Sequence, residues 1–110
     1  MTLGHKKGMP YYRIMMHGEG ICMAGTVHAK PIIGFYTTRV VKAESRSAAE
    51  EKAKGDLSEE WTSEPYVSSN SGALPTLIVE SVKVVRFFDW LRSKNRGYSF
   101  YADQDPDTVA

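Results

Sequence analysis

Residues 34–45 read GFYTTRVVKAES, a run of aromatic and β-branched residues that ends in a serine. Aromatic and β-branched side chains favour strands, whereas serine at such an exit favours the N-cap of a helix. The pattern predicts a strand over residues 33–44 and a helix capped by Ser45 or by Ser47, which has Glu50 at the capping-box spacing. This strand-to-helix transition sets the fold class.

The helix after this strand is expected to have a narrow apolar face. Its apolar residues recur every fourth position, as one stripe along the helix. The stripe consists of Ala49, Ala53, Leu57 and Trp61. Because its first half is alanine, the helix can approach a sheet closely. Gly55 lowers helix propensity by about 1 kcal/mol relative to alanine, and we expect it to end the regular helix early.

Extended segments lie on both sides of the helix. Residues 11–17 (YYRIMMH) predict a first strand, and the glycine-rich GEGICMAG after it indicates a turn, a bulge or an irregular continuation of the strand. Residues 62–75 are rich in Ser, Asn, Gly and Pro and predict a long, mobile loop. Residues 76–88 and 98–101 predict two further strands. The resulting order is β-β-α-β-β, an α+β fold in which one helix packs on one face of an antiparallel sheet.

Length and composition favour one domain. The chain has 110 residues and a net charge of +1, which gives no general attraction to nucleic acid or membranes. We expect a flexible N-terminus over residues 1–10, a single domain over 11–101 and a disordered acidic tail over 102–110. No apolar run approaches the roughly 18 residues of a membrane span, and the N-terminus lacks the apolar core of a signal peptide. The single cysteine, Cys22, forms no intramolecular disulfide, and we expect a cytoplasmic location.

Arg39 stands in the middle of the second strand and has two interpretations. As a planar fork it could bind a carboxylate or phosphate ligand, with Tyr36 and Thr38 as neighbouring contacts. As a structural residue it would pair with Glu44, with Glu80 or with an acidic residue of the helix. Strand alternation places Arg39 on one face and Tyr36 and Thr38 on the other. The structural interpretation is favoured.

The segment of residues 83–101 combines cations with aromatic residues, an arrangement that suits single-stranded nucleic acid. It carries five basic residues and one acidic residue, a local charge of +4, whereas residues 44–64 carry seven acidic and three basic residues, a local charge of −4. The candidate nucleic-acid contacts are Arg86, Arg92, Lys94, Arg96 and Tyr98. Such charge separation is equally compatible with head-to-tail self-association or with simple solubility, and the aromatic residues are also candidates for the core.

Metal and cofactor chemistry is not favoured by the residue spacing. His17, Cys22 and His28 are separated by four and five residues, with no CxxC or HxxxH pair, even when Glu19 is counted as an oxygen ligand. The glycines of GEGICMAG do not fit the dinucleotide fingerprint, because Met23 stands where its third glycine would be. We therefore expect no metal, no cofactor and no catalytic residue.

Several motifs resemble those of a group of small bacterial proteins of uncharacterised function. They are the GFYTTR strand, the alanines of the helix, TLIVESVKVV after a proline and the closing G-YSFY. The resemblance covers roughly residues 11–101, and its most specific motifs are residues 34–39 and 97–101. It implies a compact, cytosolic α+β protein with no assigned activity, and it supplies no catalytic residue.

One helix cannot cover both faces of a sheet. The aromatic residues, 11% of the chain, are spread over several predicted strands and leave apolar surface to spare. We therefore expect a non-enzymatic interaction module that forms a homodimer through its sheet, with a further protein partner possible. Nucleic-acid binding through residues 83–101 is the alternative.

Overall fold

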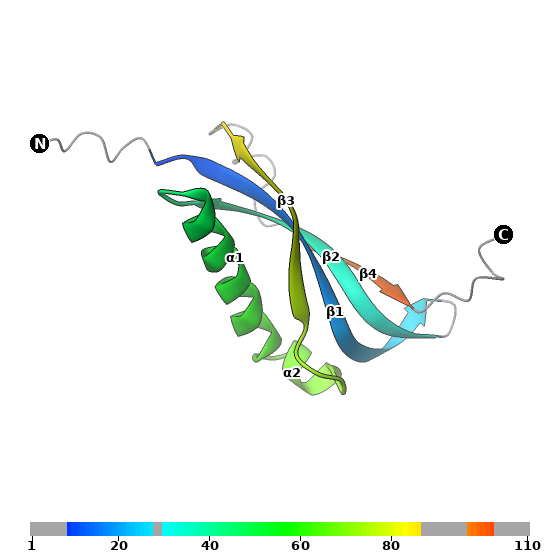
Figure 1. Cartoon of the computed structure of the whole chain (residues 1–110). Helices are drawn as coiled ribbons and strands as arrows, with labels where there is room; N and C mark the ends of the chain where they lie inside the picture. Colours follow the sequence, from blue (N-terminus) through cyan, green and yellow to red (C-terminus); the bar gives the residue numbers. More distant parts are fainter. Residues whose placement is uncertain (1–8, 28–29, 87–96, 103–110) are drawn as a thin grey trace, which may run out of the picture.

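The computed structural model describes residues 9–27, 30–86 and 97–102 (Figure 1). Its strands form a four-stranded antiparallel sheet in the order β3-β1-β2-β4, and helix α1 packs on one face of it. The predicted α+β fold and its β-β-α-β-β order are therefore confirmed, with one additional short helix. The elements are β1 (Tyr11–Val27), β2 (Lys30–Lys42), α1 (Arg46–Trp61), α2 (Tyr66–Ser69), β3 (Thr76–Val85) and β4 (Tyr98–Ala102).

Strand β1 continues through the glycine-rich segment, and one glycine on β1 and one on β2 lie beneath aromatic rings. Gly18 pairs with Phe35 on β2, and Gly34 pairs with Tyr101 on β4. A Cβ atom at Gly18 would lie 2.2 Å from the Phe35 ring, and one at Gly34 would lie 2.3 Å from the Tyr101 ring. The rings occupy the space that side chains at these positions would take. The register between β1 and β2 shifts beyond Glu19. Of the three alternatives for this segment, the irregular continuation of the strand is therefore the one that forms.

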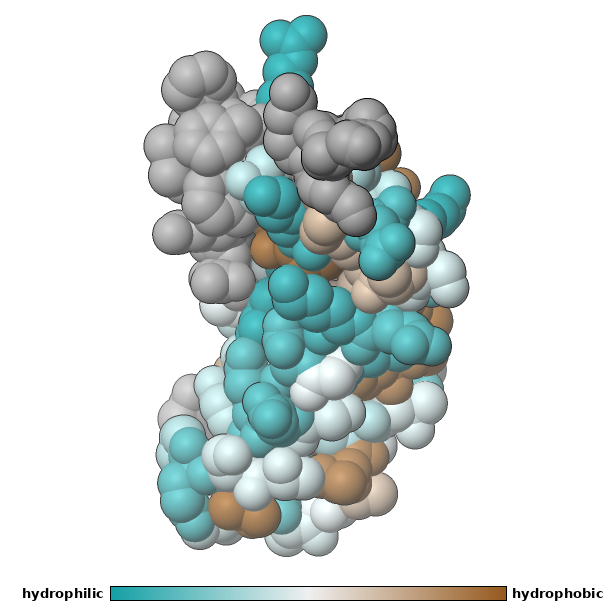
Figure 2. Space-filling model, turned by 90° about the vertical axis from the view of Figure 1, so that its left-hand side faces the viewer, coloured by the Kyte–Doolittle hydropathy of each residue, from teal (hydrophilic) through white to brown (hydrophobic). Residues whose placement is uncertain are grey.

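Helix α1 begins at the first of the two predicted caps. Ser45 has extended backbone, and its hydroxyl oxygen accepts a hydrogen bond from the Ala48 amide at 3.1 Å. The whole predicted stripe is buried, from Ala49 to Trp61. The expected early end at Gly55 is wrong, because Gly55 lies on the exposed side of the helix and the packed stripe holds the turn beyond it. Figure 2 views the molecule from the α1 side and shows a largely hydrophilic surface there.

The core consists of two neighbouring clusters between the sheet and the helices. The first packs Ile14 and Met16 of β1 against the alanines and Leu57 of α1. The second is aromatic: the rings of Phe35 and Trp61 stack with centroids 5.2 Å apart and planes 4° apart. Aromatic residues Tyr66, Tyr98 and Phe100 pack around this pair. The alanines of the stripe thus pack in the first cluster, and Trp61 at its end packs in the second.

The segment of residues 62–75, predicted to be a mobile loop, is held against β1. It contains α2, and Asn70 forms an isolated bridge with Met23. The Ser71 amide donates to the Cys22 carbonyl at 2.8 Å, and the Asn70 Oδ1 accepts from the Cys22 amide at 2.9 Å. The segment thus satisfies polar backbone groups of β1 beyond the point where β3 begins to pair.

The chain ends lie largely outside the described residues. The expected flexible N-terminus falls mostly in residues 1–8, and the expected tail in residues 103–110, so both remain predictions. Ala102 was assigned to that tail but is the buried last residue of β4. In the described part of the chain, neither helix has the length and apolar character needed to cross a bilayer.

We expect Gly18→Ala to lower the free energy of unfolding by about 1–3 kcal/mol, because the new methyl group would displace the Phe35 ring from the aromatic cluster. Gly55→Ala is the matched control. It places the same methyl group where no atom lies within 4 Å, in an exposed helical turn, and should raise the free energy of unfolding by about 1 kcal/mol. Urea unfolding of the two variants measures both values. Equal effects of the two substitutions would contradict the close packing of Phe35 on Gly18.

Candidate functional site

Arg39 faces the helix and is engaged inside the molecule. Its guanidinium forms two hydrogen bonds with the Glu60 carboxylate of α1, at 2.6 and 3.1 Å, and its Nε donates to the Thr37 hydroxyl at 3.2 Å. The Tyr98 hydroxyl donates to the same carboxylate, and the Tyr98 ring lies 5.2 Å from the guanidinium carbon. Arg39 is 9% exposed. The structural interpretation of Arg39 is therefore correct, with a helix acid as its partner.

The electrostatics of this network follow from its geometry. Hydrogen bonds from Arg39 lower the pKa of Glu60. Burial opposes the charge of Arg39, but its interactions with Glu60 and Tyr98 outweigh this and raise its pKa. Burial, followed by the hydrogen bond to Glu60, raises the pKa of Tyr98. All three groups thus keep their ordinary charges at neutral pH, and the network serves to fix α1 on the sheet.

The predicted ligand site is divided by the sheet. Tyr36 and Thr38 lie on the face opposite Arg39, as strand alternation requires, so the three side chains share no pocket. The predicted nucleic-acid contacts are divided as well. Arg86 follows β3 and is exposed, Tyr98 is committed to the network with Glu60, and Arg92, Lys94 and Arg96 lie outside the described residues.

The face of the sheet opposite α1, which we call the open face, has exposed apolar side chains at its centre. Met15, Tyr36 and Ile78 come from the three adjacent strands β1, β2 and β3, and are 42%, 44% and 38% exposed. In an antiparallel sheet with one solvated face, outward positions are normally polar. The centre of the open face departs from that pattern.

His17 anchors a polar cluster beside this apolar centre. Its ring stacks on Tyr36, with centroids 4.5 Å apart, and its Nε2 lies 2.5 Å from the Tyr101 hydroxyl oxygen. Its Nδ1 lies 3.7 Å from carboxylate oxygens of both Glu19 and Glu80. Burial, together with the charge of Glu19, raises the pKa of Tyr101. The cluster therefore brings together two carboxylates on the open face, Glu80 from the bulge of β3 near its centre and Glu19 toward one end.

The opposite end of the open face is basic. Arg13, Lys42 and Lys83 project there from β1, β2 and β3, because Arg13 pairs with Lys83 and lies two residues from the Tyr11–Lys42 pair. Lys42 lies over the Tyr11 ring at 5.8 Å. Among the described residues, neither Arg13 nor Lys83 forms an ion pair. The open face thus carries exposed apolar side chains and Glu80 at its centre, Glu19 at one end and basic residues at the other, where Val40, paired with Arg13, is only 5% exposed.

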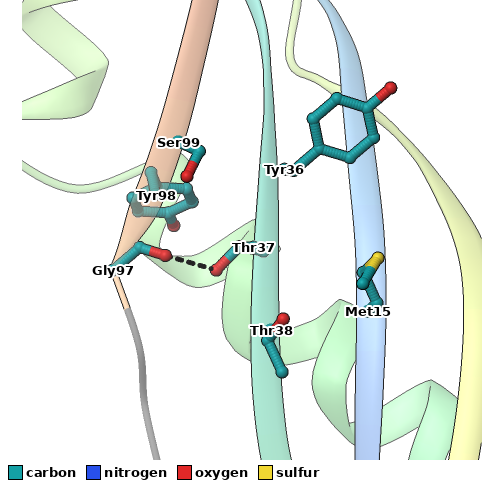
Figure 3. A pocket seen from close by; sticks show the side chains of 7 residues that line it. All are labelled: Met15, Tyr36, Thr37, Thr38, Gly97, Tyr98 and Ser99. Carbon is teal, nitrogen blue, oxygen red and sulfur yellow. Dashed lines mark hydrogen bonds between the residues drawn. The ribbon is translucent and has the colours of Figure 1, made fainter.

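Two shallow pockets lie beside Tyr36. The first, of about 430 Å³, is shown in Figure 3, where Met15 and Tyr36 lie over β1 and β2 and Ser99 projects from β4. The Thr37 hydroxyl donates to the Gly97 carbonyl at 3.1 Å along one side of it. The second, of about 420 Å³, lies between Tyr36 and Tyr101. Both pockets lie between Tyr36 and β4, so the surface around Tyr36 is hollowed toward that strand.

The potential metal ligands named from the sequence form no metal site within the described residues. Within the described residues, no group of three or more His, Cys, Asp or Glu side chains could hold a metal ion. Cys22 lies on β1 with its backbone bonded to the 62–75 segment, and His28 lies outside the described residues.

The comparisons give no further guide to the site. No protein-family model, no curated protein and no solved structure matches this chain. The resemblance to a group of small bacterial proteins therefore stays a prediction.

Sequence reasoning missed the cluster around His17. The two residues that meet at its centre, His17 and Tyr101, are 84 positions apart. One signal was present: Gly34 pairs with Tyr101, and a glycine in a strand marks a place where a neighbouring ring can lean across. Without the strand order, that signal does not identify the partner.

We expect Glu60→Gln to lower the free energy of unfolding by about 2 kcal/mol at neutral pH, because it leaves the buried charge of Arg39 without its counter-ion. The Glu60 side chain is 38% exposed, which keeps the cost below that of a fully buried pair. Glu59→Gln, an exposed neighbour with the same change of charge, is the control. Chemical unfolding of the three proteins measures the difference.

The same pair predicts a pH dependence. The pKa of Glu60 is lowered on folding from its ordinary value of 4.5, so its contribution to stability is present above pH 4.5 and is lost as the pH falls through the lowered pKa. Unfolding measured from pH 7 to pH 2 should show wild type losing its advantage over Glu60→Gln in that acidic range. A constant difference across the range would contradict a charged Glu60 as the stabilising partner.

Proposed function

We propose that this protein is a non-enzymatic interaction module that forms a homodimer through the open face. The observation that carries the proposal is the exposure of Met15, Tyr36 and Ile78 at the centre of that face. The single cysteine and the resemblance to small bacterial proteins support a reducing, cytoplasmic and bacterial setting.

The energetic gain from covering this centre is moderate. Full burial of a large apolar side chain contributes roughly 1.5–3 kcal/mol. Since Met15, Tyr36 and Ile78 are already more than half buried, each would contribute about 1 kcal/mol on association. A second copy presents the same three side chains at the same positions, so a two-fold arrangement buries two such sets at once.

The available area supports a reversible dimer. The part of β1 that pairs on both sides, from Tyr11 to Glu19, is about 30 Å long, and four strands span roughly 15–20 Å. Without the end at Val40, which is only 5% exposed, the available part of the open face is roughly 300 Å² per copy, or about 600 Å² for two copies, in the range of weak, transient interfaces. We expect a concentration-dependent equilibrium between monomer and dimer.

Tyr36→Glu should shift this equilibrium toward the monomer by at least tenfold in dissociation constant, because it places a charge at the centre of the open face. Val84→Glu is the matched control: Val84 is 65% exposed, but its pairing with Tyr12 places it on the opposite face. Sedimentation equilibrium over a range of protein concentrations measures both.

A wild-type chain that stays monomeric throughout that range would overturn the proposal. So would a dimer that Val84→Glu weakens as strongly as Tyr36→Glu does. Salt-sensitive retention of single-stranded oligonucleotides by a monomeric wild type would instead support the alternative function through residues 83–101.

A further inference from the structure

We infer that dimerisation of this protein takes up protons at His17, so that the homodimer forms most tightly below about pH 6 and weakens as the pH rises toward about 8. This coupling rests on the proposed homodimer and describes how association through the open face is regulated. It follows from the position of a histidine and two carboxylates among the apolar side chains that a second copy would cover.

Any face-to-face pairing that buries the apolar centre also buries the cluster around His17. His17 pairs with Tyr36 on β2 and with Ile78 on β3, so it lies between two of the three exposed apolar residues. Glu80 is the unpaired bulge residue of β3, and a carboxylate oxygen of Glu80 lies 3.7 Å from His17 Nδ1 on the same face. An interface over this centre therefore covers the Glu80 carboxylate too, whichever way the two copies point.

With a neutral His17, the cluster opposes association. Glu19 and Glu80 then give the cluster a charge of −2, and two copies bring two such clusters together. Among the described residues, neither carboxylate forms an ion pair with a lysine or an arginine. Like charges that face each other across an interface oppose binding, and burial of a charge without a partner adds a further cost.

A protonated His17 removes part of this cost. Its Nδ1 lies 3.7 Å from oxygens of both carboxylates, so one imidazolium serves two anions and changes the charge of the cluster from −2 to −1. The product of the charges of two facing clusters then falls from four to one. The Tyr36 ring, stacked on the His17 ring with centroids 4.5 Å apart, also favours a cation on its π-face.

His17 is the group of the cluster that changes charge near neutral pH. It is faced by Glu19 from β1, Tyr36 from β2, Glu80 from β3 and Tyr101 from β4. Side-chain carboxylates are ordinarily ionised above about pH 6 and tyrosine hydroxyls protonated below about pH 8, and burial raises the pKa of Tyr101 further. The Tyr101 hydroxyl can donate to Nε2 of the neutral ring or accept from the protonated one, so it holds the ring in both states.

Sedimentation equilibrium at about pH 6 and about pH 8, at constant ionic strength, tests the coupling. His17→Gln keeps both carboxylates but takes up no proton in this range. Glu19→Gln with Glu80→Gln keeps the histidine and removes its anions. His5→Gln with His28→Gln removes the other two histidines of the chain and is the matched control. Circular dichroism confirms that each variant is folded at both pH values.

Wild type should dimerise at least tenfold more tightly at the lower pH. His17→Gln should dimerise as weakly at both pH values as wild type does at the higher one. The double carboxylate variant should reverse the dependence, because the protonated histidines of two copies would then repel each other. The control should keep the dependence of wild type.

Contrary outcomes separate the coupling from the proposed dimer itself. A wild-type dimer that is equally strong at both pH values, or stronger at the higher one, would overturn the coupling and leave the homodimer in place. So would a dependence that His17→Gln or the double carboxylate variant retains, or that the control loses. A wild type that stays monomeric at both pH values would overturn the homodimer and, with it, the coupling.

Discussion

The packing of one helix on a four-stranded sheet is the constraint on which the rest of the structure depends. Helix α1 buries a stripe only one residue wide, and its first half is alanine, so the helix lies close to β1 and β2. A helix packed in this way covers one face, and no helix of the described residues lies on the other, although Val40 on that face is only 5% exposed. Both the hydrophilic outer side of α1 and the exposed apolar centre of the open face follow from this single layer.

The close approach of α1 also explains why a charged residue stands in the middle of β2. The stripe ends at Trp61, and the residue before it, Glu60, lies where the helix passes over the edge between β2 and β4. Arg39 reaches the Glu60 carboxylate from the sheet, and Tyr98 reaches it from β4. Three elements are thereby joined at one carboxylate. A buried pair of this kind adds less to stability than apolar packing of the same volume, but it specifies where on the sheet the helix sits.

The sequence predicted features that depend on local patterns. The strand after Gly34, the cap at Ser45 and the stripe of α1 each rest on a few adjacent positions, and each is confirmed. Features that depend on neighbours across the sheet were missed. The rings of Phe35 and Tyr101 lie over Gly18 of β1 and Gly34 of β2, and the 62–75 segment is held by backbone groups of β1. Periodicity shows which residues share a face, but it does not show which strand lies beside which.

In the candidate site, too, local patterns predicted some features, and others depended on neighbouring strands. Alternation along β2 correctly predicted that Arg39 lies on the face opposite Tyr36 and Thr38, although the three were grouped as one candidate ligand site. The identity of the Arg39 partner stayed open among Glu44, Glu80 and the acids of the helix, because the choice depends on where α1 crosses the sheet. The arrangement of charged residues on the open face was hidden for a related reason. It emerges only when the register brings Lys83 beside Arg13, and Glu80 beside His17.

The properties of the sheet favour association through the open face over association through its edge strands. Strand β4 is short, five residues, and offers few backbone groups to a further strand. Strand β3 is longer, but a register shift inserts Glu80 as an extra residue, and Lys83 is exposed beside it. Short edge strands, bulges and charged residues are the devices by which sheets resist pairing at their edges. A sheet that blocks both edges while exposing apolar side chains at its centre is suited to meet a partner face to face.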